Sequence, residues 1–379
     1  MAKQPVKVVQ IIARMNVGGP AVIVADLMRS IDSSKVEQVL ITGYCDVSEA
    51  DYLETVATDI KATRIAGLGR SVSLVADIRA FFALVAMIKK IAPDVIHTHT
   101  AKAGALGRLA AILAGRKAKR VHTFHGHLLH GYFSGWKVKL VIAIEKFLAK
   151  RTDILVAVGN QVKEDLLAAG IGKSDQYRVF FPGLVEPKKI SKEVARQQFE
   201  MEAGDIYVAY VGRMTSVKRP DRLLNTAAEI KARNLPVKFI VAGEGDLFES
   251  TKRDSERRDL PVRFLGWRKD IGALFAASDI AILTSDNEGI PLTLIQAAQA
   301  SLPIVATGVG SIGDIVVHEV NGYLVDSEPA ALADALQKLA IDPVLRGIMG
   351  GAGRERATRY FSLEKMCADR TELYQHLHR

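Results

Sequence analysis

Short apolar segments rich in β-branched residues alternate with longer amphipathic segments along almost the whole chain. The short segments are nearly all apolar, which indicates a sheet buried on both faces, whereas stretches such as residues 221–233 (DRLLNTAAEIKAR) repeat apolar residues at a period of about 3.6. This alternation predicts parallel βαβ units. The expected strands include residues 6–12, 38–42, 94–98, 120–124, 154–158, 206–212, 238–243, 262–266, 280–284 and 303–307.

The alternation is interrupted once, at VFFPGLVEPKK (179–189), and restarts about twenty residues later. A chain of 379 residues exceeds the size at which one core keeps growing, so we expect two domains here. We predict an α/β protein of two Rossmann-like, doubly wound parallel-sheet domains, residues 1–183 and 184–379, with the last helix packing back toward the first domain. Because ligands bind beyond the carboxyl ends of parallel strands, the two domains should face each other across a cleft.

Composition excludes several classes of protein. Hydrophobic residues make up 49% and charged residues 25%, as in a globular protein rather than a disordered one. No apolar run approaches the roughly 20 residues that span a bilayer, and the first residues resemble a strand more than a signal peptide. The two cysteines lack metal-binding spacing, so we expect structural thiols in a reducing cytoplasm.

The positive charge lies entirely in the first half of the chain. Residues 1–185 contain 25 Lys and Arg against 15 Asp and Glu, whereas the remainder contains 26 against 27. This asymmetry is compatible with an anionic partner of the first half, either nucleic acid or a membrane surface, and equally with a solvated basic face.

A first candidate site is YVAYVGRMTSVKRPD (207–221), which predicts a strand, a short loop and a helix beginning near Pro220. Arg213 follows the strand directly, and Lys218 comes five residues later. This arrangement can place cations and backbone N–H groups around a phosphate, although a solvated loop with two ordinary cations would have the same sequence.

A second candidate site is SDNEGIPLTLIQAAQASLPIVAT (285–307), which follows another predicted strand. Glu288 lies just beyond the carboxyl end of this strand. A helix begins at Pro291, and Gln296 lies two turns into it. The carboxylate can accept hydrogen bonds from sugar hydroxyls while the free N–H groups of residues 290–293 face anionic oxygens. Glu288 could alternatively act only as a helix cap.

Two glycine-containing turns occupy equivalent places after strands. Gly18 and Gly19 follow the first strand, and VAGEGD (241–246) follows a later one, with Gly243 and Glu244 suited to line a base or ribose. Neither is a full dinucleotide fingerprint, and the second could be an ordinary tight turn.

In this order, GRMTSVK, AGEGD, NEGIPLTLIQA and NGYLV resemble the C-terminal half of retaining family-four glycosyltransferases with the GT-B fold. NVGGPAVIVADL, DVIHTHTAKAG and VHTFHG resemble the acceptor half of the same family. The resemblance covers nearly the whole chain. It implies transfer of a sugar from a nucleotide diphosphate sugar, most often a UDP-sugar, with retention at the anomeric carbon and without a bound metal or other cofactor.

The resemblance assigns roles to individual residues. It implies that Arg213 and Lys218 neutralise the departing diphosphate, that Glu288 holds hydroxyls of the donor sugar, and that His125 faces this sugar from the acceptor half. The implied donor-binding residues are Gly19, Gly243, Glu244, Gly289, Ile290, Pro291, Leu292 and Gln296. The expected acceptor-side residues are His99, Lys102, His127 and Tyr132.

The sequence departs from the family pattern at two places. Gln296 stands where members usually have the second glutamate of a Glu-x7-Glu pattern, so it would bind the ribose hydroxyls as a neutral partner. Gly313 and Asp314 stand where many members have Pro-Glu. We expect retained donor binding with altered affinity.

The segment HTFHGHLLHGYFSGW (122–136) is rich in histidine and aromatic residues. We expect His125 at the end of a strand, His122 packed inside the domain, and the remainder as an aromatic loop on the acceptor side. A zinc site is not expected, since no cysteine or carboxylate set accompanies the histidines.

The acceptor is expected to be lipid-linked or a saccharide, in cell-surface polysaccharide or glycolipid assembly. Residues 101–120 and 137–151 are apolar with Lys and Arg at their ends, which suggests peripheral contact with an anionic membrane at the cytoplasmic face. These helices could also merely cover the sheet. Nucleic acid is not expected, because no recognised binding module is present. A catalytically weak sugar-nucleotide-binding regulator and a sugar-nucleotide epimerase stay open as alternative functions.

Overall fold

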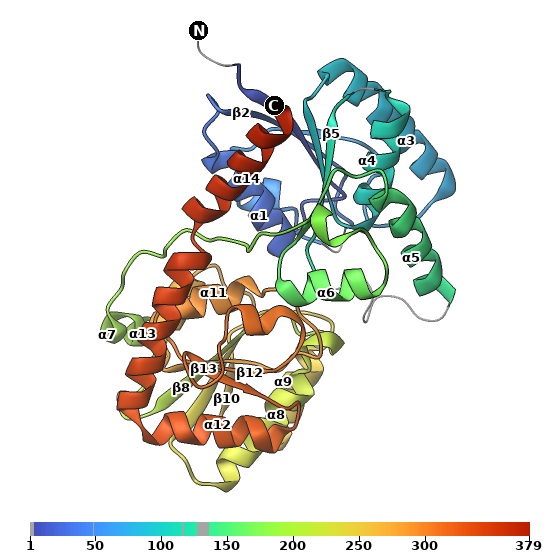
Figure 1. The fold of residues 1–379 in the computed structure, drawn as a ribbon. Helices are drawn as coiled ribbons and strands as arrows, with labels where there is room; N and C mark the ends of the chain where they lie inside the picture. The colour runs from blue at the N-terminus through green and yellow to red at the C-terminus, as the bar shows by residue number, and fades with distance from the viewer. Residues whose placement is uncertain (1–3, 48, 116, 127–135) are drawn as a thin grey trace. The chain divides into compact units, whose positions relative to one another are not determined.

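The computed structural model describes residues 4–47, 49–115, 117–126 and 136–379. The chain divides into two compact units, residues 1–183 together with 363–379, and residues 184–362. The last helix therefore groups with the N-terminal unit (Figure 1).

In the described part of the chain, the N-terminal unit holds a seven-stranded, all-parallel sheet in the order β3-β2-β1-β4-β5-β6-β7. Its strands are β1 Val6–Ile12, β2 Val36–Thr42, β3 Ala62–Arg64, β4 Val95–His99, β5 Lys119–Phe124, β6 Ile154–Ala157 and β7 Tyr177–Val179. Its helices are α1 Gly19–Ser30, α2 Tyr52–Thr55, α3 Leu74–Ile91, α4 Ala101–Leu113, α5 Trp136–Ala149, α6 Asn160–Ala168 and α14 Leu363–His378.

Helices cover both faces of this sheet and so bury its central strands on each side. Side chains of α3 and α4 form one hydrophobic cluster with β1, β2 and β4, while α1 packs with β1 and β2 in a second cluster. α14 adds to the covering by packing against α1 and against β1, β2 and β4.

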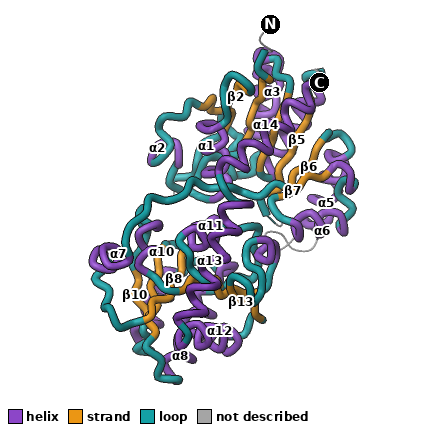
Figure 2. Tube along the Cα trace, turned by 60° about the vertical axis from the view of Figure 1, so that its left-hand side comes forward, coloured by secondary structure: helices purple, strands orange, loops and turns teal. Residues whose placement is uncertain are grey.

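The C-terminal unit repeats the topology with six parallel strands among its described residues, in the order β10-β9-β8-β11-β12-β13 (Figure 2). Its strands are β8 Ile206–Val211, β9 Val237–Ala242, β10 Val262–Phe264, β11 Ile280–Leu283, β12 Ile304–Thr307 and β13 Gly322–Val325. Its helices are α7 Lys192–Gln198, α8 Pro220–Ala232, α9 Phe248–Arg257, α10 Ile271–Ala277, α11 Leu292–Gln299, α12 Pro329–Ile341 and α13 Pro343–Tyr360, with short 3-10 turns at Ser216–Lys218 and Gly310–Asp314.

The prediction of two doubly wound parallel sheets is confirmed, and the strands named from the sequence lie within about two residues of their observed positions. β3, β7 and β13 were not expected. They span only three or four residues and lie at the ends of the sheets, and so short a segment carries too few residues for a clear strand pattern.

A buried ion pair joins α4 to α5. Nη2 of Arg108 lies 2.7 Å from both carboxylate oxygens of Glu145, and the two side chains are 1% and 3% exposed. Nε of Arg108 also donates to the carbonyl of Gly104 at 2.8 Å.

We expect Glu145→Ala to lower the free energy of unfolding of the N-terminal unit by about 3–5 kcal/mol, because the buried guanidinium would lose its carboxylate. Denaturant unfolding followed by circular dichroism measures the change. Asp32→Asn, which removes an exposed carboxylate beside Lys35, is the matched control and should cost less than about 1 kcal/mol. An equal effect of the two substitutions would contradict this assignment.

Candidate functional site

In both units, successive strands are added first on one side of the initial strand and then on its other side. β1 lies between β2 and β4, and β8 lies between β9 and β11. The connections that leave two such neighbouring strands diverge to opposite faces, and the gap between them is where open parallel sheets bind ligands. The residues predicted for function lie in the segments that follow β1, β4 and β5 in one unit and β8, β9 and β11 in the other. Each unit thus has its own half-site.

In the C-terminal unit, Lys218 and Glu288 form an ion pair. Lys218 ends the 3-10 turn after β8, and Glu288 lies in the loop after β11, so the pair joins the two connections at the reversal point. The hydroxyl of Ser285 donates to Oε1 of Glu288 at 2.6 Å. The side chains of Lys218 and Glu288 are 20% and 11% exposed, so both can still reach a ligand.

Further hydrogen bonds join the connection after β8 to the loop after β11. Arg222, from the first turn of α8, donates from Nη1 to the carbonyl of Thr284 at 2.6 Å and from Nη2 to Oδ1 of Asp286 at 2.8 Å. The hydroxyl of Thr284 donates in turn to the carbonyl of Lys218 at 2.9 Å. These charge-assisted bonds fix the position of the Lys218 backbone relative to the loop that carries Glu288.

The loop after β9 approaches the loop after β8 so closely that only glycine fits. Gly243 has φ +131°, and a Cβ there would lie 2.0 Å from the carbonyl oxygen of Gly212. Between its glycines, Glu244 is exposed, and its Oε1 accepts a hydrogen bond from the backbone N–H of Trp267 at 3.2 Å. The predicted turn VAGEGD is therefore a close backbone approach that presents one carboxylate.

The helix after Glu288 begins without a side-chain cap. α11 starts at Leu292, directly after Pro291, and no side chain bonds to its first N–H groups in the described structure. Its amino end therefore keeps hydrogen-bond donors and a partial positive charge next to Gly289. Gln296 lies one turn further along and is partly exposed, whereas Ile290 and Pro291 are buried.

The other predicted cation of this unit is Arg213. It follows β8 by two residues and is exposed, whereas Lys218 is held in the ion pair with Glu288.

In the N-terminal unit, histidines from β4 and the end of β5 form a buried hydrogen-bond network with α14. Nδ1 of His99 lies 2.9 Å from Nε2 of His125, and Nε2 of His99 lies 2.9 Å from Oε1 of Gln10 on β1. Nε2 of Gln10 donates to the hydroxyl of Tyr374 at 3.0 Å, and this hydroxyl lies 2.6 Å from Nδ1 of His97. Strand register brings these side chains together, since Gln10 of β1 pairs with His97 of β4 and His99 lies two residues further along on the same face.

The partners in this network determine which ring nitrogen carries each proton. Oε1 of Gln10 can only accept, so Nε2 of His99 donates to it and Nδ1 of the same neutral ring accepts. His125 must then donate from Nε2 to His99, which leaves Nδ1 of His125 as an unprotonated acceptor. Among the described residues this nitrogen has no hydrogen-bond partner. His125 thus offers a lone pair held in one orientation.

Burial keeps these rings neutral. Burial, aided by the charge of Arg370, lowers the pKa of His125 to about 3, and the same causes hold the pKa values of His97 and His99 well below 6.5. Arg370 lies on α14, is 2% exposed and stacks over the ring of Phe180 at 4.6 Å. A fixed cation next to three imidazoles disfavours a proton on any of them.

The remaining predicted residues differ in what surrounds them. Lys102 is held by Asp77 at 2.6 Å and by the carbonyls of Gly67 and Ser71, so a ligand would have to displace these partners. Gly19 is the first residue of α1. His127 and Tyr132 lie outside the described residues.

His122 is packed inside the unit. Its Nδ1 lies 2.8 Å from the hydroxyl of Thr98, and a Cβ at Gly104 would lie 2.4 Å from its Cε1.

Sequence reasoning missed Gln10, Ser285, Arg370 and Tyr374, which come from a strand interior, a loop and the last helix. A glutamine among the apolar residues 8–12 of β1 was the available signal. Neither cysteine is a thiolate at neutral pH, because burial raises the pKa of Cys45 to about 12 and that of Cys367 to about 11. Among the described residues, no group of three or more His, Cys, Asp or Glu side chains is arranged to hold a metal ion.

Models of known protein families match both of the chain's units. Residues 18–183 match the model of the "Glycosyl transferase 4-like domain", and residues 191–356 match that of "Glycosyl transferases group 1". The chain belongs to the group 1 glycosyltransferases with the GT-B fold. The family resemblance seen in the sequence is thereby confirmed.

Two relatives and two solved structures illustrate the range of this glycosyltransferase family. The chain is 29% identical to a UDP-Gal:alpha-D-GlcNAc-diphosphoundecaprenol alpha-1,3-galactosyltransferase of Escherichia coli, over 86% of this chain and 85% of that one. It is 22% identical to the capsular polysaccharide biosynthesis glycosyltransferase CapM of Staphylococcus aureus, over 86% and 88%.

Among solved structures, Anabaena HepE in complex with UDP and glucose superposes with a TM-score of 0.81 at 21% identity, covering 98% of this chain and all of that one. A sucrose-phosphate synthase of Thermosynechococcus elongatus superposes with a TM-score of 0.83 at 21% identity, covering 98% and 99%. At this identity the structures support the fold of the glycosyltransferase.

Acid should destabilise the N-terminal unit of this glycosyltransferase, because its buried histidines bind protons only after unfolding. The pKa of His125 is about 3 in the folded chain and near 6.5 when unfolded, so between these values the unfolded chain holds more protons. The free energy of unfolding therefore falls as the pH falls through this window, by about 1.4 kcal/mol per pH unit for each such histidine.

The slope is measured by denaturant unfolding between pH 4.5 and 7. His125→Gln should reduce the slope by about 1.4 kcal/mol per pH unit, the contribution of one proton, and the imidazole signal of His125 in the native protein should not shift in NMR spectra over this range. A His125 resonance that titrates near pH 6.5 in the folded protein would contradict the prediction.

Proposed function

We propose that this chain is a retaining glycosyltransferase that moves a hexose or N-acetylhexosamine from a UDP-sugar to a lipid-linked or saccharide acceptor in cell-surface polysaccharide assembly. The observation that carries the proposal is the Lys218–Glu288 ion pair at the point where the C-terminal sheet reverses its order. A cation and a carboxylate held side by side beyond the strand ends match the two polar parts of a nucleotide sugar, its diphosphate and its sugar hydroxyls.

The proposed role of Lys218 and Arg213 is to stabilise the diphosphate as its bond to the sugar breaks. Negative charge develops on the leaving diphosphate, and fixed cations lower the energy of that state most when they need not move to meet it. Lys218 is fixed by its ion pair and by the loop bonds beneath it, while the exposed Arg213 can close onto the phosphates after binding. Two such cations would do the work of a metal ion, so we propose a metal-independent reaction.

The proposed donor pocket continues on both sides of this pair. Glu288 accepts hydrogen bonds from sugar hydroxyls, while the uncapped N–H groups at the start of α11, around Gly289, bind the sugar or phosphate oxygens. Gln296, on the same helix, bonds the ribose hydroxyls as a neutral partner. The backbone at Gly243 and the carboxylate of Glu244 line the nucleoside.

His125 is proposed to act on the donor sugar from the N-terminal unit. Its unprotonated Nδ1 can accept a hydrogen bond from a sugar hydroxyl, and the bond from Nε2 to His99 fixes the ring for that contact. A pKa of about 3 makes the ring a weak base, so His125 orients the substrate rather than removing its proton. The acceptor hydroxyl would then lose its proton to an oxygen of the donor phosphate.

The relatives support the choice of donor and acceptor. The Escherichia coli relative is named for a UDP-Gal donor and a GlcNAc-diphosphoundecaprenol acceptor, and the Staphylococcus aureus relative for capsular polysaccharide biosynthesis. HepE was solved with UDP and glucose. A regulator that only binds sugar nucleotides and a sugar-nucleotide epimerase are the alternatives, and both differ from a transferase in leaving the acceptor unmodified.

The exposed face of α5 supports contact with a membrane. Leu140, Ile144 and Phe147 are 51%, 41% and 47% exposed and follow one another at helical spacing, flanked by exposed lysines. α4 packs against α5 and against α3 (Figure 1). On α3, Leu74, Ile78 and Phe82 form a second exposed apolar stripe. No described helix is long and apolar enough to cross a membrane. We propose peripheral binding at the inner face of the cytoplasmic membrane.

Substitutions in the two half-sites should separate donor binding from transfer. Lys218→Ala should lower the transfer rate by about 10²- to 10³-fold and weaken UDP binding, because the diphosphate loses its fixed cation. His125→Ala should lower transfer while leaving UDP affinity unchanged. UDP release with and without a lipid acceptor, calorimetric UDP binding, and the anomeric configuration of the product by NMR measure these effects. Lys252→Ala, an exposed lysine on α9, is the control.

Wild-type protein that binds UDP-sugars but never transfers the sugar would favour the regulator, and interconversion of the donor sugar without any acceptor would favour the epimerase. An inverted product would overturn the retaining assignment.

The membrane contact is tested by flotation with vesicles containing anionic or only zwitterionic lipids. Leu140→Ser, Ile144→Ser and Phe147→Ser together should reduce binding to anionic vesicles by roughly tenfold or more, because each removes exposed apolar area from the interface. The triple variant should still unfold cooperatively, with a thermal midpoint lowered by no more than roughly 10 °C, since these side chains are only half-buried. Equal flotation of the triple variant would overturn the contact.

A further inference from the structure

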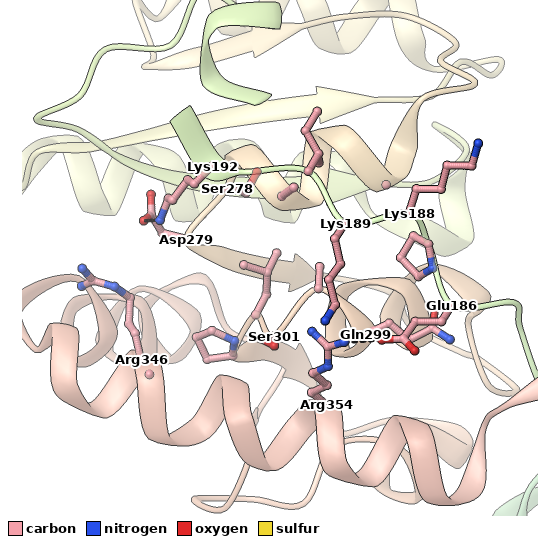
Figure 3. A pocket seen from close by; sticks show the side chains of 18 of the residues that line it. Glu186, Lys188, Lys189, Lys192, Ser278, Asp279, Gln299, Ser301, Arg346 and Arg354 are labelled. Atoms are coloured by element: carbon pink, nitrogen blue, oxygen red, sulfur yellow. Dashed lines mark hydrogen bonds and ion pairs between the residues drawn. The ribbon is translucent and has the colours of Figure 1, made fainter. Parts of the chain in front are cut away.

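The C-terminal unit contains a cavity of about 540 Å³ at the edge of the sheet opposite to Lys218 and Glu288 (Figure 3). Ser278 and Asp279, directly before β11, and Leu302 and Pro303, directly before β12, line it at the amino ends of these strands. Its other walls come from residues 186–190 and 192, from α10, from residues 299–301 at the end of α11, and from the first three turns of α13 up to Arg354. A volume of this size suits a small-molecule ligand.

The lining carries five cations and two carboxylates. Asp279 is fully engaged, because it accepts hydrogen bonds from Lys192 at 2.5 Å, from Arg196 at 2.7 Å and from a backbone N–H. The other carboxylate, Glu186, is paired with Arg354. The cavity therefore keeps an excess of positive charge after its carboxylates are paired, which favours an anion inside it.

The charged groups gather at two ends of the cavity (Figure 3). Lys192, Asp279 and Arg346 lie at one end. At the other, the ends of Lys189 and Arg354 point toward one another. Lys189 has no carboxylate partner among the described residues, whereas Arg354 is paired with Glu186. An anion between the two cations therefore shares the Arg354 guanidinium with that carboxylate and gains the charge of Lys189.

A hydrogen-bond acceptor lies beside these cations. Gln299, the last residue of α11, lines the cavity and is 6% exposed, and its Nε2 donates to the carbonyl of Leu184 at 3.3 Å. Its Oε1 is buried and has no hydrogen-bond partner in the described structure. A buried acceptor without a donor costs about 1–3 kcal/mol, which a ligand hydroxyl would offset.

We propose that this cavity binds a phosphorylated polyol, with its phosphate between Lys189 and Arg354 and a hydroxyl donating to Oε1 of Gln299. The phosphate would neutralise the excess positive charge, and the hydroxyl would donate a hydrogen bond to the unpartnered Oε1 of Gln299. One ligand would therefore provide both interactions. The same chemistry occurs in a free sugar phosphate or glycerol phosphate and in the headgroup of phosphatidylglycerol. This site is separate from the proposed donor site, because it lies at the amino ends of the strands.

Isothermal titration of the full chain with glycerol 3-phosphate tests the site. Glycerol 3-phosphate should bind at least several-fold more tightly than inorganic phosphate, because only the former supplies a hydroxyl to Gln299. The double variant Lys189→Gln/Arg354→Gln should weaken its binding by roughly tenfold or more, since both phosphate partners are lost. Arg354 and Glu186 are exposed enough for this variant to fold.

Two further variants complete the test. Lys252→Gln removes an exposed lysine outside the cavity and should leave the affinity for glycerol 3-phosphate unchanged. Lys218→Ala should also leave it unchanged. If Lys218→Ala abolishes the binding instead, the phosphate occupies the donor site and the proposal is overturned. Absence of binding to the wild type, or equal binding by the double variant, would overturn it as well.

Flotation with phosphatidylglycerol vesicles separates the two sources of the ligand. If the double variant loses vesicle binding while it keeps the α5 residues, the ligand is a lipid headgroup. If vesicle binding is unchanged and only glycerol 3-phosphate binding is lost, the ligand is a free phosphate compound.

Discussion

The parallel order of both sheets is the constraint on which the rest of the structure depends. Parallel strands need crossover connections, so all strands in one sheet end at the same edge and the loops that follow them meet there. In both units the strand order reverses once, between β1 and β4 and between β8 and β11. Each reversal brings together residues that are distant in sequence, which is how Lys218 reaches Glu288 and how Gln10 reaches His99.

The two half-sites differ in their electrostatics: one contains an ion pair, and the other contains buried neutral imidazoles. In the C-terminal unit, opposite charges are paired and remain partly exposed. Under the proposed function, a ligand carrying both a diphosphate and hydroxyls replaces each partner. In the N-terminal unit, four buried imidazoles are kept neutral by burial and by the nearby cations Arg370 and Arg108. The first arrangement suits charge that develops during a reaction, and the second suits orientation by neutral hydrogen bonds.

The last helix contributes more than a cover for the sheet. Tyr374 of α14 completes the hydrogen-bond network of Gln10 and His97, and Arg370 supplies its buried positive charge. Because both residues follow the C-terminal unit in the sequence, the N-terminal half-site is complete only after the whole chain has been made. Removing α14 would therefore disturb the orientation of His99 and His125 as well as the packing of the unit.

The sequence by itself determined the fold class and most strand positions, because strands buried on both faces are apolar throughout and the connecting helices have a different period. It also placed Lys218 and Glu288 where predicted strands pass into helices, which is where the structure has them. It could not determine that these two form an ion pair, nor that Lys102 is held by Asp77, because such contacts join residues whose separation along the chain carries no pattern. The proton positions on His99 and His125, the buried Arg370 and the cavity around Lys189 and Gln299 were likewise decided only by tertiary structure, which sets burial and so determines which polar groups find partners.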